Sequence, residues 1–233
     1  MERLKPKSNY IPPEQFQILV DNVNLLSPRI MKVEDIQMLF KITRYCGLRI
    51  SEATSLTAED IDTELKEVII KRSKTKWHFC KCAKTKTRKS FRRERKVMIS
   101  CDENCTRCNG KGKVHEPDKT SIPPDFIPEL DEYLKGKTGR LFNTNRFTVH
   151  YWLKVLGKRL NITALTTPQS ETHEKTKCHI FRKSIGKDML YQGLKLNEVS
   201  AKLRHNDLTT TSDYLKLKLE DVKLAEEGFS TKG

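Results

Sequence analysis

The sequence has no apolar run that approaches the roughly 18 to 20 residues of a membrane-spanning helix. The first residues, MERLKPKSNYIPPEQF, are basic but lack the apolar stretch of a secretory signal. An internal repeat is absent as well. These absences argue against membrane insertion, export and a repeat array. We therefore expect one large domain or two small ones in the cytoplasm, since 233 residues suffice to bury a real core.

Acidic residues are scarce in one segment. Residues 71–113 contain 16 Lys and Arg but only three acids, a local net charge of +13, while the whole chain carries +15. Concentrated positive charge favours a polyphosphate partner, because each neutralised phosphate releases condensed counterions. A solvated face or a disordered tail is the alternative, but the internal position argues against a tail. The segment does not resemble a membrane-binding amphipathic helix, so we expect nucleic acid.

Cysteine is unevenly distributed. Two of the seven cysteines stand alone, and the other five crowd into 29 residues: Cys80, Cys82, Cys101, Cys105 and Cys108. Without an export signal, metal binding explains this cluster better than disulfides do. The C-x-x-C pair at Cys105 and Cys108, followed by alternating glycines, is typical of a zinc knuckle.

The cysteine cluster predicts a structural zinc site. The expected ligands are Cys80, Cys82, Cys105 and Cys108, with Cys101, His78 and His115 in reserve. A closed set of four soft ligands would serve structure rather than catalysis. The segment is too polar to have much core of its own, so a metal would supply folding free energy. Five reduced thiols in a loop are the alternative.

Hydrophobic periodicity predicts a mainly helical chain with one small antiparallel sheet around the basic segment, an α+β fold. A strand is expected at residues 67–71, and the polar, Pro-containing residues 165–177 indicate a loop. The expected helices cover residues 12–26, 33–46, 124–134, 149–160, 180–191, 196–203 and 209–217, with a short one near Ser51.

Four polar residues of the C-terminal half stand at suggestive spacings. His179 and Arg182 lie three apart at the start of an expected helix and so share a face. His205 follows Arg182 by 23 residues, and Tyr214 follows His205 by nine. Each feature alone is unspecific, since a single Tyr on an amphipathic helix belongs to the core more often than to a site.

The joint pattern resembles the catalytic domain of the tyrosine recombinase (phage integrase) family. The family's G-L-R-x-S-E, H-x-x-R, L-G-H and T-T-x-x-Y motifs are matched by residues 47–52, 179–182, 203–205 and 210–214. Two features depart from the family. Arg204 replaces the glycine of L-G-H, and a Cys-rich insertion interrupts the sheet where the family keeps its catalytic lysine.

The resemblance implies a tyrosine recombinase catalytic domain over residues 12–217, with the basic Cys-rich insertion at residues 77–118. Residues 1–11 would then be a linker and residues 218–233 a C-terminal tail. Only about 30 residues precede the second expected helix, too few for the family's separate N-terminal clamp. We therefore expect either a fragment or a minimal member.

The resemblance also implies that double-stranded DNA is cleaved and rejoined through a 3′-phosphotyrosine, with no cofactor for catalysis. The implied catalytic residues are Arg49, Lys74, His179, Arg182, His205 and Tyr214, with Glu52 in support. The residue types suit this chemistry independently. Each of two guanidinium groups can donate two hydrogen bonds to the oxygens of a crowded, highly charged phosphoryl transition state. A carboxylate such as Glu52 can orient a cation.

The position of the family's lysine is open in this sequence. The family places it in a tight turn after a strand, and Lys74 after residues 67–71 fits best. Lys76, Lys84 and Lys86 remain alternatives, because residues 84–88 also resemble the turn. Simple contact with DNA phosphates would explain any of these lysines equally well.

Other functions would use parts of the same pattern. A type IB topoisomerase-like or telomere-resolving enzyme would use the same residues in a different assembly. A zinc-containing DNA-binding regulator without catalysis would not require Tyr214 at its spacing. By resemblance we expect a homo-oligomer, a tetramer on DNA and a monomer when free. We also expect an association with the nucleoid and with a mobile genetic element.

Overall fold

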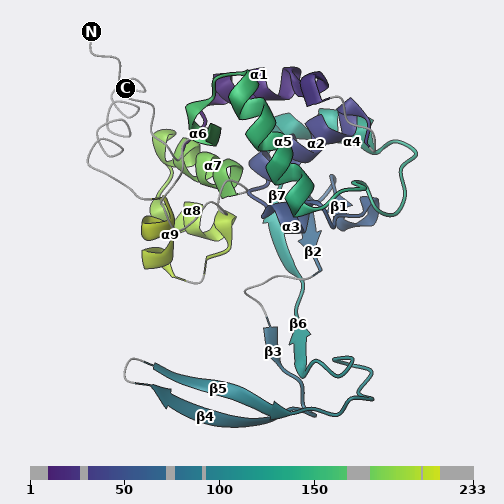
Figure 1. The fold of residues 1–233 in the computed structure, drawn as a ribbon, viewed down its shortest axis with the longest axis vertical. Helices are drawn as coiled ribbons and strands as arrows, with labels where there is room; N and C mark the ends of the chain where they lie inside the picture. The colour runs from purple at the N-terminus through teal and green to yellow at the C-terminus, as the bar shows by residue number, and fades with distance from the viewer. Residues whose placement is uncertain are drawn as a thin grey trace. The chain divides into compact units, whose positions relative to one another are not determined.

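The computed structural model describes residues 10–26, 31–71, 77–90, 93–166, 179–205 and 207–215 (Figure 1). The chain divides into two compact units, one of residues 1–69 and 119–233 and the other of residues 70–118. We describe each unit by itself. Among the described residues, no helix is both long and apolar enough to span a bilayer. The predicted mixed α+β class is confirmed.

The N-terminal part of the larger unit is helical. It comprises α1 (Pro13–Asp21), the 3-10 helix η1 (Val23–Leu26), α2 (Val33–Tyr45) and the short α3 (Ile50–Ala53). The expected single helix to Leu26 is wrong in detail, since α1 ends at Asp21 and a 3-10 turn follows. After α2, Gly47 has a φ of 60°, a left-handed conformation that a glycine adopts without strain. This turn sends the chain directly into α3.

A three-stranded sheet follows the helices of the larger unit. The 3-10 helix η2 (Ala58–Asp60) leads to β1 (Ile61–Asp62) and β2 (Glu67–Ile70), and β7 (Asp118–Ser121) completes the order β1-β2-β7. The expected strand at 67–71 is therefore confirmed as β2. The expectation of one sheet around the basic segment is wrong, because the described residues form three separate sheets.

The rest of the larger unit is again helical. It contains η3 (Pro124–Phe126), α4 (Ile127–Leu134), α5 (Arg146–Arg159), α6 (Thr163–Thr166), α7 (Ile180–Tyr191), α8 (Leu196–Leu203) and α9 (Leu208–Leu215). The bounds expected for α7 and α8 are confirmed. The loop expected from residue 165 begins too early, since α6 includes Leu165, and residues 167–177 lie outside the described residues.

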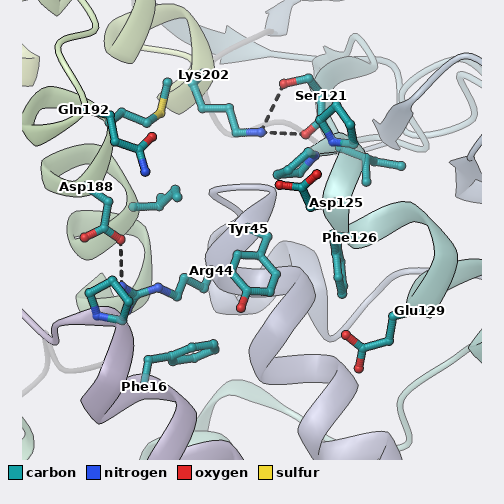
Figure 2. A pocket seen from close by; sticks show the side chains of 16 residues that line it. Phe16, Arg44, Tyr45, Ser121, Asp125, Phe126, Glu129, Asp188, Gln192 and Lys202 are labelled. Carbon is teal, nitrogen blue, oxygen red and sulfur yellow. Dashed lines mark hydrogen bonds and ion pairs between the residues drawn. The ribbon is translucent and has the colours of Figure 1, made fainter. Parts of the chain in front are cut away.

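Helix α7 packs against both α1 and α2. The ring of Phe181 lies 5.3 Å from the rings of Phe16 in α1 and of Phe40 in α2, measured between centroids. Further along the same interface, Arg44 of α2 forms an ion pair of 2.7 Å with Asp188 of α7, and both side chains are buried (Figure 2). The aromatic contacts and the ion pair thus fix α7 along its length.

Helices α8 and α9 pack close to α7 at Gly186 (Figure 1). A Cβ atom at this position would lie 2.9 Å from Cδ2 of Leu215 in α9 and 3.1 Å from Cδ1 of Leu203 in α8. Val199, Leu203 and Leu215 form a small buried apolar cluster beside it. The absence of a side chain at Gly186 therefore permits the close approach of the three helices.

The smaller unit consists of two antiparallel strand pairs. Strand β3 (Trp77–Phe79) pairs with β6 (Lys113–His115), and β4 (Lys84–Ser90) pairs with β5 (Arg93–Ser100) (Figure 1). A register shift between Lys84 and Thr85 interrupts the second pair. Val97, Met98 and Ile99 of β5 are exposed, so this hairpin buries little apolar surface. Its strands were not expected from the sequence.

Removal of the Asp188 carboxylate should destabilise the larger unit. Asp188→Ala would leave the Arg44 guanidinium, which is 1% exposed, without its counter-charge, and we expect a loss of about 3–5 kcal/mol. Urea unfolding measures this loss. Asp125→Ala is the matched control, because Asp125 lines the same pocket but is exposed, and it should change stability by no more than about 0.5 kcal/mol. Equal effects of the two substitutions would contradict the assignment.

Candidate active site

The turn between α2 and α3 positions the first candidate arginine. Arg49 is the residue before α3, and Glu52 lies at the third position of that helix. The Glu52 carboxylate accepts hydrogen bonds from the backbone N–H of Arg49 at 2.8 Å and from its Nη1 at 2.7 Å. The carboxylate therefore holds both the start of the helix and the guanidinium group.

Helix α7 brings the second candidate arginine to the same turn. Arg182 is 1% exposed, and its Nη1 donates to the backbone carbonyl of Gly47 at 2.5 Å. Gly47 lies two residues before Arg49, so residues 135 positions apart meet here. His179 is the residue before α7 and lies one turn ahead of Arg182. The structure confirms that His179 and Arg182 lie together at the start of one helix.

The end of α8 adds a third arginine that the sequence analysis treated only as a departure from the family. Arg204 follows α8 in a left-handed conformation, with a φ of 53°. Its Nη2 donates to Oε2 of Glu52 at 2.6 Å, and both side chains are buried. Burial raises the pKa of Glu52, but the charges of Arg204 and Arg49 outweigh it, so the pKa lies below its ordinary value. We call Arg49, Arg182 and Arg204, with Glu52, the arginine cluster.

His205 lies beside the arginine cluster. Its Nδ1 is 3.0 Å from Oγ1 of Thr211, a residue of α9. Burial, together with the nearby charges of Arg182, Arg49 and Arg204, lowers the pKa of His205 to about 4. The imidazole is therefore neutral at neutral pH. Thr211 is fully buried, and its pairing with His205 was not anticipated from the sequence, although it belongs to the T-T-x-x-Y segment.

Two expected catalytic residues have side chains outside the described part. Tyr214 lies on α9, three residues after Thr211, and only its backbone is described. Lys74 and its alternative Lys76 fall within residues 72–76, which are not described. Lys84 and Lys86 lie on β4 and are exposed. The structure thus brings Arg49, Glu52 and Arg182 to one turn and places His205 beside them. The catalytic roles of these residues, of His179, of Tyr214 and of the lysine stay predictions.

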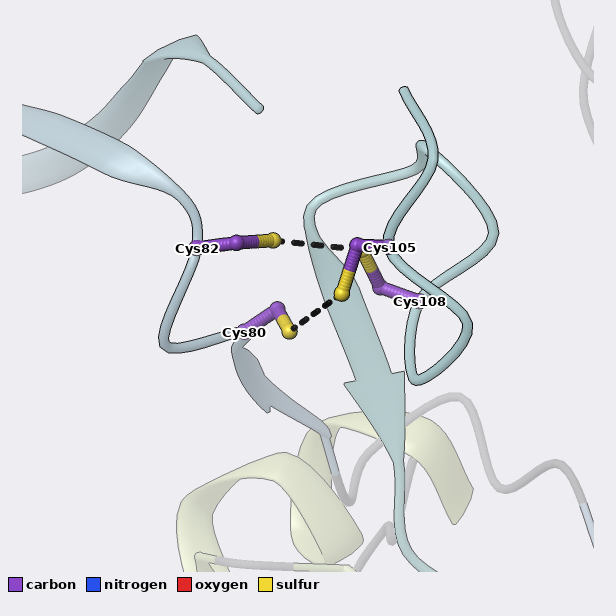
Figure 3. Close-up of side chains that lie close together, drawn as sticks. All are labelled: Cys80, Cys82, Cys105 and Cys108. Atoms are coloured by element: carbon purple, nitrogen blue, oxygen red, sulfur yellow. Dashed lines mark hydrogen bonds between the residues drawn. The ribbon is translucent and has the colours of Figure 1, made fainter. Parts of the chain in front are cut away.

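The thiols of the smaller unit converge (Figure 3). The Sγ atoms of Cys80, Cys82, Cys105 and Cys108 all lie within 4.8 Å of one another. Cys80 is 3.7 Å from Cys105, and Cys82 is 3.5 Å from Cys108. Zinc bound tetrahedrally at about 2.3 Å per sulfur would separate its ligands by about 3.8 Å, whereas a disulfide requires about 2.05 Å. The predicted four cysteines therefore fit a tetrahedral metal ion.

The loop after Cys108 and the remaining thiol shape this cluster. Asn109, Gly110 and Gly112 have φ values of 47°, 70° and 62°, so the chain turns sharply back toward the sulfurs. Burial raises the pKa of Cys108, but hydrogen bonds from neighbouring thiols and from the Gly112 backbone N–H lower it to about 6. Cys101 lies 3.2 Å from Cys82 and 3.3 Å from Cys108. It is therefore a fifth thiol at the cluster. His78 instead contacts Glu116 at 3.1 Å.

A pocket of about 680 Å³ lies elsewhere in the larger unit (Figure 2). Its wall includes the Arg44–Asp188 ion pair and Lys202, whose Nζ donates to the backbone carbonyl of Ser121 at 2.6 Å. Of the expected catalytic residues whose side chains the structure describes, none lines this pocket. The arginine cluster and the pocket are therefore separate features of the larger unit.

Solved structures share this fold. The integrase of transposon Tn1549 in complex with circular intermediate DNA matches with a TM-score of 0.55 and 14% identity, over 96% of this chain and 66% of that chain. XerA recombinase matches with a TM-score of 0.54 and 14% identity, over 96% of this chain and 64% of that chain. The catalytic domain of bacteriophage HP1 integrase matches with a TM-score of 0.54 and 14% identity, over 94% and 93% of the two chains. No curated protein matches the sequence significantly.

The fold is thus that of tyrosine recombinase catalytic domains. Residues 9–122, just under half of the chain, match the phage integrase family. This chain shares its fold with the three solved structures at 14% identity. It spans slightly less than two thirds of the Tn1549 integrase and XerA chains and nearly all of the HP1 catalytic domain.

Proposed function

We propose that residues 12–217 form the catalytic domain of a site-specific DNA recombinase, or integrase, that cleaves and rejoins strands through a 3′-phosphotyrosine on Tyr214. The arginine cluster is the observation that carries this proposal. Its members come from distant parts of the chain. Arg49 and Arg204 share the Glu52 carboxylate, and Arg182 donates to the carbonyl of Gly47, two residues before Arg49. Such an excess of forked donors suits a phosphodiester, which offers several acceptor oxygens and a negative charge.

The proposed reaction exchanges one phosphate ester for another. The Tyr214 oxygen attacks phosphorus and forms a P–O bond as the bond to the 5′-oxygen breaks. The pKa of a phenol is about 10, so a base must take its proton. His179 is proposed for this role. The departing 5′-oxygen takes up a proton from a lysine, proposed as Lys74. Because the phosphotyrosine conserves the ester bond, a second DNA 5′-hydroxyl can reverse the step.

Arg49, Arg182 and His205 are proposed as donors to the non-bridging oxygens. Charge accumulates on these oxygens in the transition state, and donors already in place need no reorganisation. Support for His205 comes from its contact with Thr211, whose hydroxyl can donate to Nδ1 and leave Nε2 protonated. A neutral imidazole in this tautomer still offers one N–H to a phosphate oxygen.

Double-stranded DNA is the proposed partner. The complex of Tn1549 integrase with circular intermediate DNA supports this proposal, and so does the net charge of +15. We further propose that the protein is a monomer when free and a tetramer on DNA, close to the nucleoid. The relation to a transposon integrase supports a role in a mobile genetic element.

Tyr214→Phe should abolish covalent attachment to DNA and leave binding nearly unchanged, because the substitution removes only one hydroxyl. A nicked duplex that traps the covalent complex, followed by denaturing electrophoresis, measures attachment. Tyr191→Phe is the matched control, since Tyr191 is another tyrosine near the end of a helix. An intact adduct in Tyr214→Phe would reassign the nucleophile. Relaxation of a single duplex without joining of two would favour a topoisomerase-like enzyme.

Arg182→Lys keeps the charge but loses the forked geometry and the bond to Gly47, so we expect cleavage to fall by about 10²–10³. Single-turnover cleavage of the nicked duplex measures the effect. Arg140→Lys is the matched control. Arg140 also donates to backbone carbonyls, those of Thr54 and Thr144, but lies outside the arginine cluster. Near-normal cleavage by Arg182→Lys would contradict bidentate hydrogen bonding of the phosphate by Arg182.

We propose that Cys80, Cys82, Cys105 and Cys108 bind one structural zinc ion. The convergence of their sulfurs supports the ligand set. A zinc ion bound by four thiolates has no open position, so its contribution would be folding free energy for the smaller unit. The exposed apolar residues of β5 support this need, because the hairpin has little core of its own.

Elemental analysis of the purified protein should find one zinc per chain. Cys108→Ser should lose the metal, whereas Cys101→Ser, a matched substitution of the fifth thiol, should retain it. Removal of zinc by a chelator should speed amide exchange in residues 77–118 and weaken DNA binding, while the helices of the larger unit stay protected. Metal-free protein with a protected smaller unit would contradict the site.

A further inference from the structure

Arg204 occupies a backbone position that ordinarily favours glycine. Its φ of 53° lies in the left-handed region, where a residue with a side chain is strained by about 1–2 kcal/mol. The family motif that the segment resembles has glycine at this place. The guanidinium is nevertheless turned inward, and the side chain is only 5% exposed. A strained residue with a buried charge needs a compensating interaction, and Glu52 provides it.

The contacts of Arg204 connect the end of α8 to the start of α3 within the candidate site. Arg204 Nη2 lies 2.6 Å from Glu52 Oε2, and Glu52 Oε1 lies 2.7 Å from Arg49 Nη1. One carboxylate therefore bridges the two guanidinium groups, and it is 6% exposed. Without Arg204, one side of this buried carboxylate would lose its charged donor. The Glu52 side chain, and Arg49 with it, could then adopt other positions.

The charge of Arg204 also lowers the pKa of the next residue, His205. Groups from four places act on His205: Thr211 from α9, Arg182 from α7, Arg49 before α3, and Arg204 itself. After burial, the three arginines hold the pKa of His205 at about 4. Removal of one of these charges should therefore raise the pKa of His205 toward its ordinary value.

We propose that Arg204 is a positioning residue, which holds Arg49 in place through Glu52. The proposal rests on the proposed function, because Arg49 is there assigned to the scissile phosphate. In a relative with glycine at this place, Glu52 would orient Arg49 without this second guanidinium. Here the orientation of Arg49 is shared between α3 and the end of α8. Arg204 itself need not touch DNA.

The test compares Arg204→Gly and Arg204→Lys with the unchanged protein. Glycine fits the backbone at a φ of 53° without strain, so Arg204→Gly should fold. Lysine keeps the charge. Lys66→Gly is the matched control, because Lys66 is also a cation with a positive φ, 57°, but its side chain is exposed in the turn between β1 and β2.

Two readouts follow from the geometry. The first is titration of the His205 ring by NMR in DNA-free protein, with the signal assigned by a His205→Gln variant. The second is single-turnover cleavage of a nicked duplex at saturating DNA. For Arg204→Gly we expect a raised pKa of His205 and cleavage slower by about 10- to 100-fold, with DNA affinity little changed. Arg204→Lys should keep the titration near that of the unchanged protein but cleave more slowly. Lys66→Gly should match the unchanged protein in both readouts.

Each outcome decides the proposal. An unchanged His205 titration together with cleavage within twofold of normal in Arg204→Gly would overturn it, even if the melting temperature fell, because Arg204 would then serve packing alone. An effect of equal size in Lys66→Gly would overturn it as well. If the unchanged protein forms no covalent complex with DNA, the proposed function fails. The titration in DNA-free protein still shows whether Arg204 acts on the site.

Discussion

The buried ion pair between Arg44 and Asp188 is the constraint on which the candidate site depends. It joins α2 to α7, and Tyr10 and the Ile11 carbonyl complete its hydrogen bonds. Because α7 carries Arg182, the pair and the rings around Phe181 decide where Arg182 lies relative to the turn at Gly47. A buried pair of this kind contributes little net stability against an apolar alternative, but it strongly disfavours other registers of the two helices.

The helices that carry the site could be predicted from the sequence, whereas the contacts between their side chains could not. The bounds of α7 and α8 were predicted correctly, because apolar residues at helical spacing and Gly193 between them mark both helices. The motifs also pointed to Arg49, Arg182 and His205. The ion pair of Arg204 with Glu52 was missed, since these residues are 152 positions apart and no local pattern relates them.

The smaller unit was the part in which sequence periodicity failed. Strand β4 consists almost entirely of Lys, Arg and Thr, and β5 joins charged residues to three consecutive apolar ones. Neither strand alternates apolar and polar residues, so no buried face predicts them. The cysteines were a better guide than hydrophobicity. Their spacing predicted the four sulfurs that the structure brings together. In a segment with so few apolar residues, the proposed zinc ligands rather than a core would specify the local structure.

The attachment of α9 has a consequence for control of the proposed reaction. Among the α9 residues whose side chains the structure describes, Thr211 and Leu215 are the buried ones. Burial of one leucine is worth about 1.5–3 kcal/mol, which corresponds to an equilibrium constant of about 10 to 150. Among the described side chains of α9, the burial of Leu215 and the contact of Thr211 with His205 are therefore interactions of a size that binding of a partner can offset. If Tyr214 is the proposed nucleophile, a partner that engages the exposed side of α9, where Leu208 is 49% exposed, would change how often Tyr214 reaches the phosphate.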